Sequence, residues 1–170
     1  MKTLRLLPAL LGLAAASPLL AAPNSRTVVI FDHPENFSDV RDGYFPSDKG
    51  REAILSEIRD DVVDCTRHLL PQGDTLKVTF TDIHLAGDFR PDRGPGWDEV
   101  RIVKDIYPPS FKFSWAVSDP SGHVVKQGSE DIRDLNFQYR MTLDVTDPLR
   151  YEKAILNDWA RESLGSLKRS

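Results

Sequence analysis

An alternating run of residues near the middle of the chain constrains the fold most. From Phe111 to Val117, aromatic and aliphatic residues alternate with small or polar ones, which makes one side of a strand apolar and the other polar. The segment Asp119–Gly122 follows, with proline second and glycine fourth, as is typical of a type I turn. Residues 123–131 are expected to return as the partner strand. The result is an antiparallel hairpin with one apolar face that other elements must cover.

Two segments have the helical period that such a cover requires. Residues 49–70 carry apolar side chains every three or four positions, with Ser47 or Asp48 as a cap and Pro71 as a stop. The members of this stripe are Ile54, Ile58, Val62, Cys65 and Leu69. Residues 148–164 carry a second stripe, formed by Tyr151, Ile155, Trp159 and Leu164. Both segments are therefore predicted to be amphipathic helices.

Three further runs are the expected strands 27–31, 75–85 and 100–106. In the second run the apolar positions change side near Asp82, which predicts a β-bulge. Residues 134–145 alternate only weakly and are an edge strand or an extended segment. The order β-α-β-β-β-β-α predicts one α+β domain over residues 23–170. We expect an antiparallel sheet of four to five strands with two helices packed on one face.

The first 22 residues have the build of a secretory signal peptide. Lys2 and Arg5 give it a positive start, the mainly apolar run 4–13 is too short to span a bilayer, and small residues come next. Cleavage is expected near Ala21 or Ala22, with residues 14–16 as a competing site. The sequence therefore predicts a protein that ends in the periplasm or the medium.

Charge and cysteine content narrow the classes of function. The chain carries 22 basic and 26 acidic side chains, and loss of residues 1–22 would change its net charge from −4 to −6 by removing Lys2 and Arg5. An acidic domain without a long basic run argues against nucleic acid or anionic lipid as the main partner. We also expect no stable membrane insertion after cleavage of the signal peptide. Cys65 is the only cysteine, so no internal disulfide can form. It is expected to be a small buried hydrophobe; a reactive thiol or a disulfide to another chain is the alternative.

A weak candidate metal site lies around the predicted bulge. Asp82 and His84 are two residues apart on a strand and point to the same side, with Asp88 in the following loop. His33, at the end of the first strand, could complete a set of oxygen and nitrogen ligands. No compact ligand signature joins these residues, and an aspartate at a bulge can instead accept backbone N–H groups. We therefore expect no metal or cofactor and keep a metal- or small-ligand-binding protein as the second hypothesis.

Catalytic patterns are missing from the sequence. It contains no nucleophile elbow, no phosphate-binding glycine loop and no cysteine–histidine pairing signal. Acidic residues are many, but no spacing selects two of them as a catalytic pair. No residue is therefore predicted to be catalytic, and a carboxylate-based hydrolase is the third hypothesis.

The loop 88–97 is the best candidate for a contact surface. It mixes aromatic residues and arginines with glycines and prolines, a composition that suits a semi-rigid recognition loop. The candidate contact residues are Asp82, Phe89, Arg90, Arg93, Trp97 and Tyr107. The alternative is that Phe89 and Trp97 anchor the loop to its own domain.

Three segments of the chain resemble one bacterial family. Val78–Phe89, Val100–Pro109 and Arg133–Phe137 together resemble the domain of unknown function 3016 family, and the likeness extends over nearly all of residues 23–170. The resemblance implies a small exported bacterial protein and brings no activity or catalytic residues with it. A looser similarity, at the level of fold, links the chain to small α+β accessory proteins of the Gram-negative envelope. We therefore expect a non-enzymatic binding or envelope accessory module whose partner is another envelope protein or a small ligand.

Overall fold

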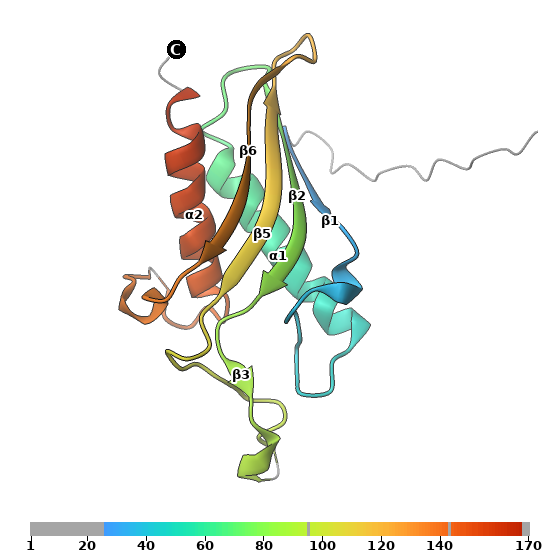
Figure 1. Cartoon of the computed structure of the whole chain (residues 1–170), viewed down its shortest axis with the longest axis vertical. Helices are drawn as coiled ribbons and strands as arrows, with labels where there is room; N and C mark the ends of the chain where they lie inside the picture. Colours follow the sequence, from blue (N-terminus) through green and yellow to red (C-terminus); the bar gives the residue numbers. More distant parts are fainter. Residues whose placement is uncertain (1–25, 95, 143, 168–170) are drawn as a thin grey trace, which may run out of the picture.

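The computed structural model describes residues 26–94, 96–142 and 144–167, so the expected signal peptide lies outside the described residues. Four strands form the main sheet in the order β1 (Thr27–Phe31), β2 (Thr75–His84), β5 (Ser110–Ser118) and β6 (Val124–Arg133). Helices α1 (Asp48–Thr66) and α2 (Arg150–Leu164) lie together behind this sheet (Figure 1). The short strands β3 (Asp88–Phe89) and β4 (Arg101–Ile102) form a second sheet. Short 3-10 helices are η1 (Pro34–Asn36), η2 (Pro91–Arg93) and η3 (Phe137–Tyr139). The α+β prediction is confirmed.

The main sheet is mixed, which corrects the prediction that it is antiparallel. β1 runs parallel to β2, with Thr27 opposite Leu76 and Phe31 opposite Phe80. The reason is that α1 carries the chain back across one face of the sheet, and a crossover helix joins adjacent strands in parallel. Periodicity shows which face of a strand is buried but not the direction of its neighbour. The remaining pairs, β2–β5 and β5–β6, are antiparallel as predicted.

The predicted bulge is confirmed, whereas residues 100–106 and the edge strand or extended segment expected at residues 134–145 differ from the prediction. The register between β2 and β5 shifts between Phe80 and Asp82. Of residues 100–106, only Arg101–Ile102 forms a strand, and it pairs with β3 instead of joining the main sheet. Residues 134–145 contain the 3-10 helix η3 and no strand among the residues described there.

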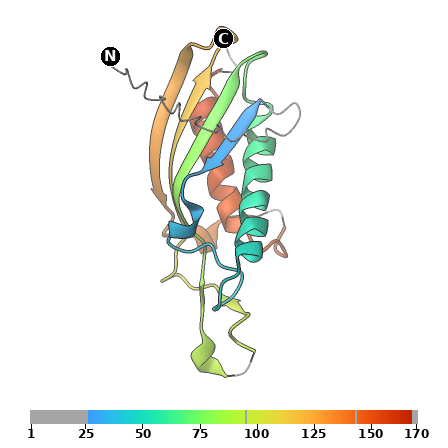
Figure 2. The same ribbon diagram turned by 90° about the vertical axis from the view of Figure 1, so that its right-hand side faces the viewer.

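The core lies between the helices and one face of the sheet, as Figure 2 shows. The ring centroid of Phe113 on β5 lies 5.0 Å from that of Phe80 on β2. The same ring packs edge-on against Trp159 of α2, with 4.9 Å between the ring centroids. The apolar stripes of both helices therefore face the sheet. At the start of α1, Ser47 is the cap as predicted, since its hydroxyl accepts the Gly50 N–H at 2.9 Å.

Cys65 lies half-buried on α1 and packs against the core. Its thiol lies 3.5 Å from the carbonyl oxygen of Val62, to which it can donate. Burial, and next the nearby Asp61 carboxylate, raise the pKa of Cys65 to about 12. Cys65 therefore packs as a small hydrophobe, as predicted, but it is only partly buried.

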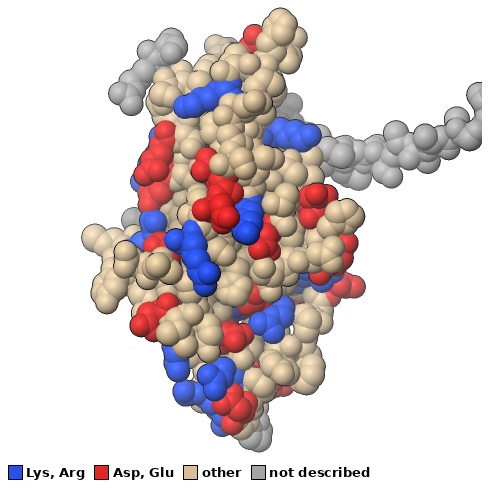
Figure 3. All heavy atoms as spheres, in the orientation of Figure 1, with Lys and Arg blue, Asp and Glu red and all other residues tan. Residues whose placement is uncertain are grey.

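Two regions extend beyond the packed layers. The opposite face of the sheet is uncovered and polar, and acidic and basic side chains are interspersed over the side of the molecule seen in Figure 3. Residues 88–94 and 96–107, here called the tongue, project from the end of the sheet (Figures 1 and 2). Within the described part of the chain, no helix is long and apolar enough to cross a membrane.

Candidate functional site

The base of the tongue is joined to the body by a buried ion pair. Asp39, in the connection between β1 and α1, is only 2% exposed. Arg101 of β4 donates to both of its carboxylate oxygens, at 2.8 and 3.1 Å, and Arg41 Nε donates to Oδ1 at 2.7 Å. Burial alone would raise the pKa of Asp39, but the hydrogen bonds from the two guanidinium groups outweigh burial and hold this pKa below its usual range.

Phe89 is part of this base and does not lie on the surface. It is 4% exposed, and the guanidinium carbons of Arg101 and Arg41 lie 4.5 and 5.6 Å from its ring centroid. Arg41 also pairs with Asp88, at 3.0 Å. The aromatic ring and the two cations therefore stabilise each other where the tongue begins.

A second buried acid connects the base to α2. Glu152, in the first turn of that helix, is 1% exposed, and its Oε1 accepts the backbone N–H of Ala86 at 2.6 Å. Its Oε2 has no hydrogen-bond partner among the described residues. Burial raises the pKa of Glu152, which favours the neutral acid. The neighbouring Gly87 has φ +84°, and its carbonyl oxygen accepts a hydrogen bond from Arg101 at 3.0 Å.

The outer end of the tongue exposes apolar side chains. Trp97 is 38% exposed, and the guanidinium of Arg93 lies 5.7 Å from its ring centroid. The backbone N–H of Tyr44 donates to the Asp98 carbonyl at 2.8 Å, so the loop before α1 lies against the tongue. Phe45 in that loop is 78% exposed. We call these residues the tongue surface: Tyr44, Phe45, Arg93, Trp97 and Val100.

The other predicted contact residues lie around this region. Arg90 donates two hydrogen bonds to Asp92, at 2.9 and 2.8 Å. Tyr107 is half-buried, and its carbonyl accepts the Gly87 N–H at 3.0 Å. Asp82 lies away from the tongue on the main sheet. The structure therefore brings Arg93 and Trp97 together at the outer end and places Phe89 and Tyr107 nearer the base.

The structure does not assemble the candidate metal ligands. Asp82 accepts hydrogen bonds from the backbone N–H and hydroxyl of Ser38, at 2.7 and 2.8 Å, as an aspartate at a bulge can do. Asp88 pairs with Arg41, and His33 lies exposed next to Glu35. Across the described residues, no group of three or more histidine, cysteine or acidic side chains could hold a metal ion.

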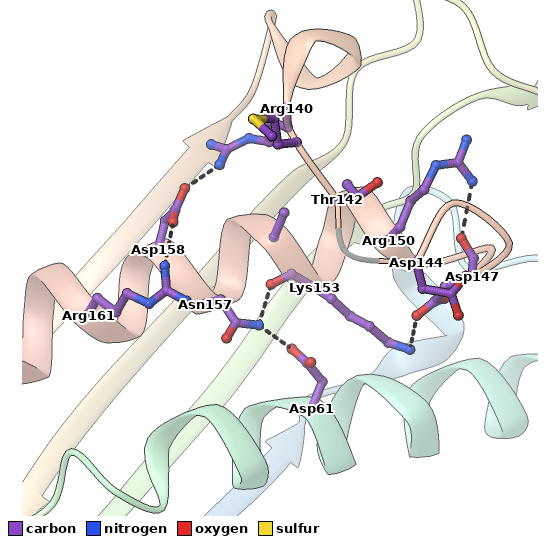
Figure 4. Close-up of a pocket in the computed structure, with 12 residues that line it drawn as sticks. Asp61, Arg140, Thr142, Asp144, Asp147, Arg150, Lys153, Asn157, Asp158 and Arg161 are labelled. Carbon is purple, nitrogen blue, oxygen red and sulfur yellow. Dashed lines mark hydrogen bonds and ion pairs between the residues drawn. The ribbon is translucent and has the colours of Figure 1, made fainter.

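A cavity of about 450 Å³ lies beside the two helices, on the side of the molecule opposite the uncovered face of the sheet. Half of its lining residues come from α2, and Figure 4 shows that the loop after Arg140 lies above the cavity and that Asp61 points from α1 toward Asn157. Its lining residues are Asp61, Arg140, Met141, Thr142, Asp144, Asp147, Arg150, Lys153, Ala154, Asn157, Asp158 and Arg161. Burial raises the pKa of Asp61 to about 6.

Comparison with known proteins identifies the family. The family model described as "Protein of unknown function (DUF3016)" matches residues 25–162, which is most of the chain. The chain belongs to this family. A search of curated proteins gives no match, and neither does a search of solved structures.

The segments that resemble the DUF3016 family meet at the base of the tongue. The first contains Gly87 and Phe89, and the second contains Arg101, which contacts both of them. The third follows β6, where the Asp134 N–H donates to the carbonyl of Pro109 at 3.2 Å. These segments are distant in sequence, and the fold brings them together at this end of the sheet.

Sequence reasoning missed the residues that lock this base. Asp39 and Arg101 are 62 positions apart, and no periodic pattern joins them. One signal was present for Glu152, which lies three positions before Ile155 on the apolar stripe of α2. A charged residue on a buried stripe needs a partner in the protein interior.

Proposed function

We propose that this DUF3016 protein is an exported binding module of the bacterial envelope that contacts another protein through the tongue surface. The observation that carries the proposal is the exposure of aromatic residues on a projecting segment whose base is buried. Trp97 lies next to Arg93, and the exposed Phe45 packs against Tyr44, whose backbone N–H binds the tongue at Asp98. Tryptophan, tyrosine and arginine are the residues most enriched at energetically important positions of protein interfaces.

The rigid base supports this assignment. A partner that binds a flexible segment must offset the entropy of ordering it, which weakens binding. Here Arg101 and Asp39 fix the start of the tongue, and the Tyr44–Asp98 hydrogen bond fixes it a second time farther out. The tongue surface is therefore held in one arrangement before a partner arrives.

Export and the type of partner belong to the same proposal. The charged start, apolar run and small residues of positions 1–22 support transport out of the cytoplasm. Interspersed acidic and basic side chains, together with a net negative charge, favour a protein partner over nucleic acid or an anionic membrane.

Site-specific photo-crosslinking in the native host tests the proposal. A photoreactive amino acid replaces Glu99, which is exposed and lies between Trp97 and Val100. We expect one specific adduct that disappears in a Trp97→Ala background and persists in a Val145→Ala background, because Val145 is exposed outside the tongue. An adduct that Trp97→Ala leaves unchanged would contradict the proposal.

The metal-binding alternative has a separate test. It requires that Asp82, His84 and Asp88 gather around an ion, whereas Ser38 and Arg41 already engage two of these carboxylates. A metal bound only by the folded protein raises its melting temperature. We therefore expect a chelator to leave the melting temperature unchanged; a clear fall would favour the metal hypothesis instead.

A further inference from the structure

We propose that the cavity beside α1 and α2 binds a small zwitterion, a molecule with a protonated amine and a carboxylate such as an amino acid or a short peptide. The argument starts from the charged side chains of its wall. Four are acidic and four are basic, so the wall as a whole carries no strong charge of either sign. What distinguishes them is which ones already have a partner of opposite charge.

Five of the eight charged groups are engaged in ion pairs with each other. Arg140 pairs with Asp158, whose other oxygen lies 3.8 Å from Arg161. Lys153 Nζ donates to Asp147, and also to Glu57 outside the cavity, at 2.6 Å each. These contacts leave Asp61, Asp144 and Arg150 without an ion-pair partner in the described part of the chain.

Of the three, Asp144 is occupied by its own loop. Its Oδ1 accepts the backbone N–H and the hydroxyl of Thr146, at 2.8 and 2.6 Å, and the residue is exposed. Asp144 is therefore engaged within its own loop. The groups that remain for a ligand are therefore one carboxylate and one guanidinium.

The free carboxylate is that of Asp61. It is half-buried, and its nearest side-chain donor is Asn157 Nδ2, at the long distance of 3.5 Å. The same Nδ2 donates to the Lys153 carbonyl at 2.8 Å, while Asn157 Oδ1 accepts no hydrogen bond from a described residue. Figure 4 shows Asp61 and Asn157 facing one another across the helices. Two adjacent acceptors, one of them charged, suit a protonated amine.

The free guanidinium is that of Arg150. It donates to the Asp147 carbonyl at 3.1 Å and to the hydroxyl of Tyr151 at 3.2 Å, both neutral acceptors. Its carbon lies 4.4 Å from the centroid of the Tyr151 ring, which holds it in place. Arginine has five N–H donors in a planar fork, so enough remain to bind a carboxylate with two hydrogen bonds.

Titration by NMR of the ¹⁵N-labelled protein tests the site. The probes are L-lysine, L-glutamate, L-alanine and the dipeptide Ala-Ala, with cadaverine and hexanoate as probes that carry only the amine or only the carboxylate. We expect at least one zwitterion to cause saturable shifts in the amide signals of residues 150–161. Cadaverine and hexanoate, which each lack one of the two groups, should bind at least about tenfold more weakly, because the charge-assisted contact with Arg150 or with Asp61 is lost.

Matched variants assign the two contacts. Asp61→Asn and Arg150→Gln should each weaken binding of the best zwitterion by about tenfold or more. Asp60→Asn and Arg67→Gln, which change exposed residues of the same kinds on or beside α1, should leave it unchanged. Absence of saturable shifts with all four zwitterions would overturn the proposal. So would equal binding of cadaverine, or equal losses in the control variants.

Discussion

Two acidic residues that are shielded from solvent in this protein have pKa values shifted in opposite directions. Asp39 is almost completely buried, yet two arginines hold its pKa below the usual range. Asp61 is only half-buried, yet its pKa rises to about 6, because its burial is not compensated by a counter-ion in contact. At the base of the tongue, the buried carboxylate has contacting counter-ions, whereas the carboxylate beside α2 has none among the described residues. The first arrangement stabilises the fold, and the second is the basis of the ligand site that we propose.

The largest effect should come from breaking the complete network. Asp39→Ala leaves Arg101 and Arg41 facing each other without their shared carboxylate, and removing one partner of a buried pair costs about 3–5 kcal/mol. Urea unfolding measures this loss. Asp92→Ala, which removes an exposed pair with Arg90 in the same tongue, should leave the free energy of unfolding close to that of the parent protein, because exposed ion pairs contribute little. Similar costs for both variants would show that the base is not a distinct structural element.

A smaller loss is expected when the network keeps its charges but loses its aromatic ring. Phe89→Ala removes a buried ring and leaves a cavity between two guanidinium groups, which should cost about 2–4 kcal/mol. The free energy of unfolding and hydrogen exchange at the amides of β3 and β4 report the effect. Unchanged exchange there would contradict the role of Phe89 as an anchor.

Asp61→Asn should act in the opposite direction and stabilise the protein. The pKa of this carboxyl rises from 3.8 to about 6 on folding. The folded protein therefore loses stability as the pH increases through this range, because the unfolded chain releases the proton at a lower pH. Lys153 lowers this pKa, while Asp147 and Asp64 raise it further. The full linkage value is about 3 kcal/mol, and partial exposure reduces the expected gain to about 1 kcal/mol at pH 8.

The pH dependence provides the control for this comparison. At pH 4 the Asp61→Asn variant and the parent protein should have nearly equal unfolding free energies, because Asp61 is protonated in the folded state. The Asp39 contribution has the reverse sign, since a lowered pKa stabilises above the ordinary value of 3.8 and is lost as the pH falls. Equal effects of Asp61→Asn at pH 4 and pH 8 would contradict the charge argument.

The smallest effect is expected at the outer end of the tongue. Trp97→Ala removes a partly exposed ring that stacks on Arg93, and exposed substitutions change stability by about 0.5 kcal/mol or less. Thermal unfolding measures the change. A loss comparable with that of Phe89→Ala would make Trp97 a structural residue and weaken the proposed contact surface.

Local patterns in the sequence predicted much of the fold. The apolar stripe of α1, the alternation of β5 and the bulge next to Asp82 all follow from which residues lie side by side along the chain. The direction of β1 does not, because strand orientation depends on where α1 returns the chain. In the loop before α1, Phe37 is buried whereas Phe45 is largely exposed, and nothing in the local sequence separates these two aromatic residues.

The candidate sites were less accessible to such reasoning. Composition selected residues 88–97 and so found Arg93 and Trp97, but it could not separate them from the buried Phe89. Asp39 and Asp61 are ordinary acids in sequence, one in a polar loop and the other on the charged side of a helix. Their opposite environments arise only when segments many residues apart are packed together.

The chemistry of Cys65 has a practical consequence for experiments in solution. A thiol with a pKa of about 12 holds roughly a thousandfold less thiolate at neutral pH than an ordinary cysteine, and thiolate is the species that alkylating reagents attack. The native chain therefore already serves as a background for selective labelling. A single cysteine introduced at Glu99 or Ser166, both exposed, would take up a maleimide dye or spin label while Cys65 stays unmodified.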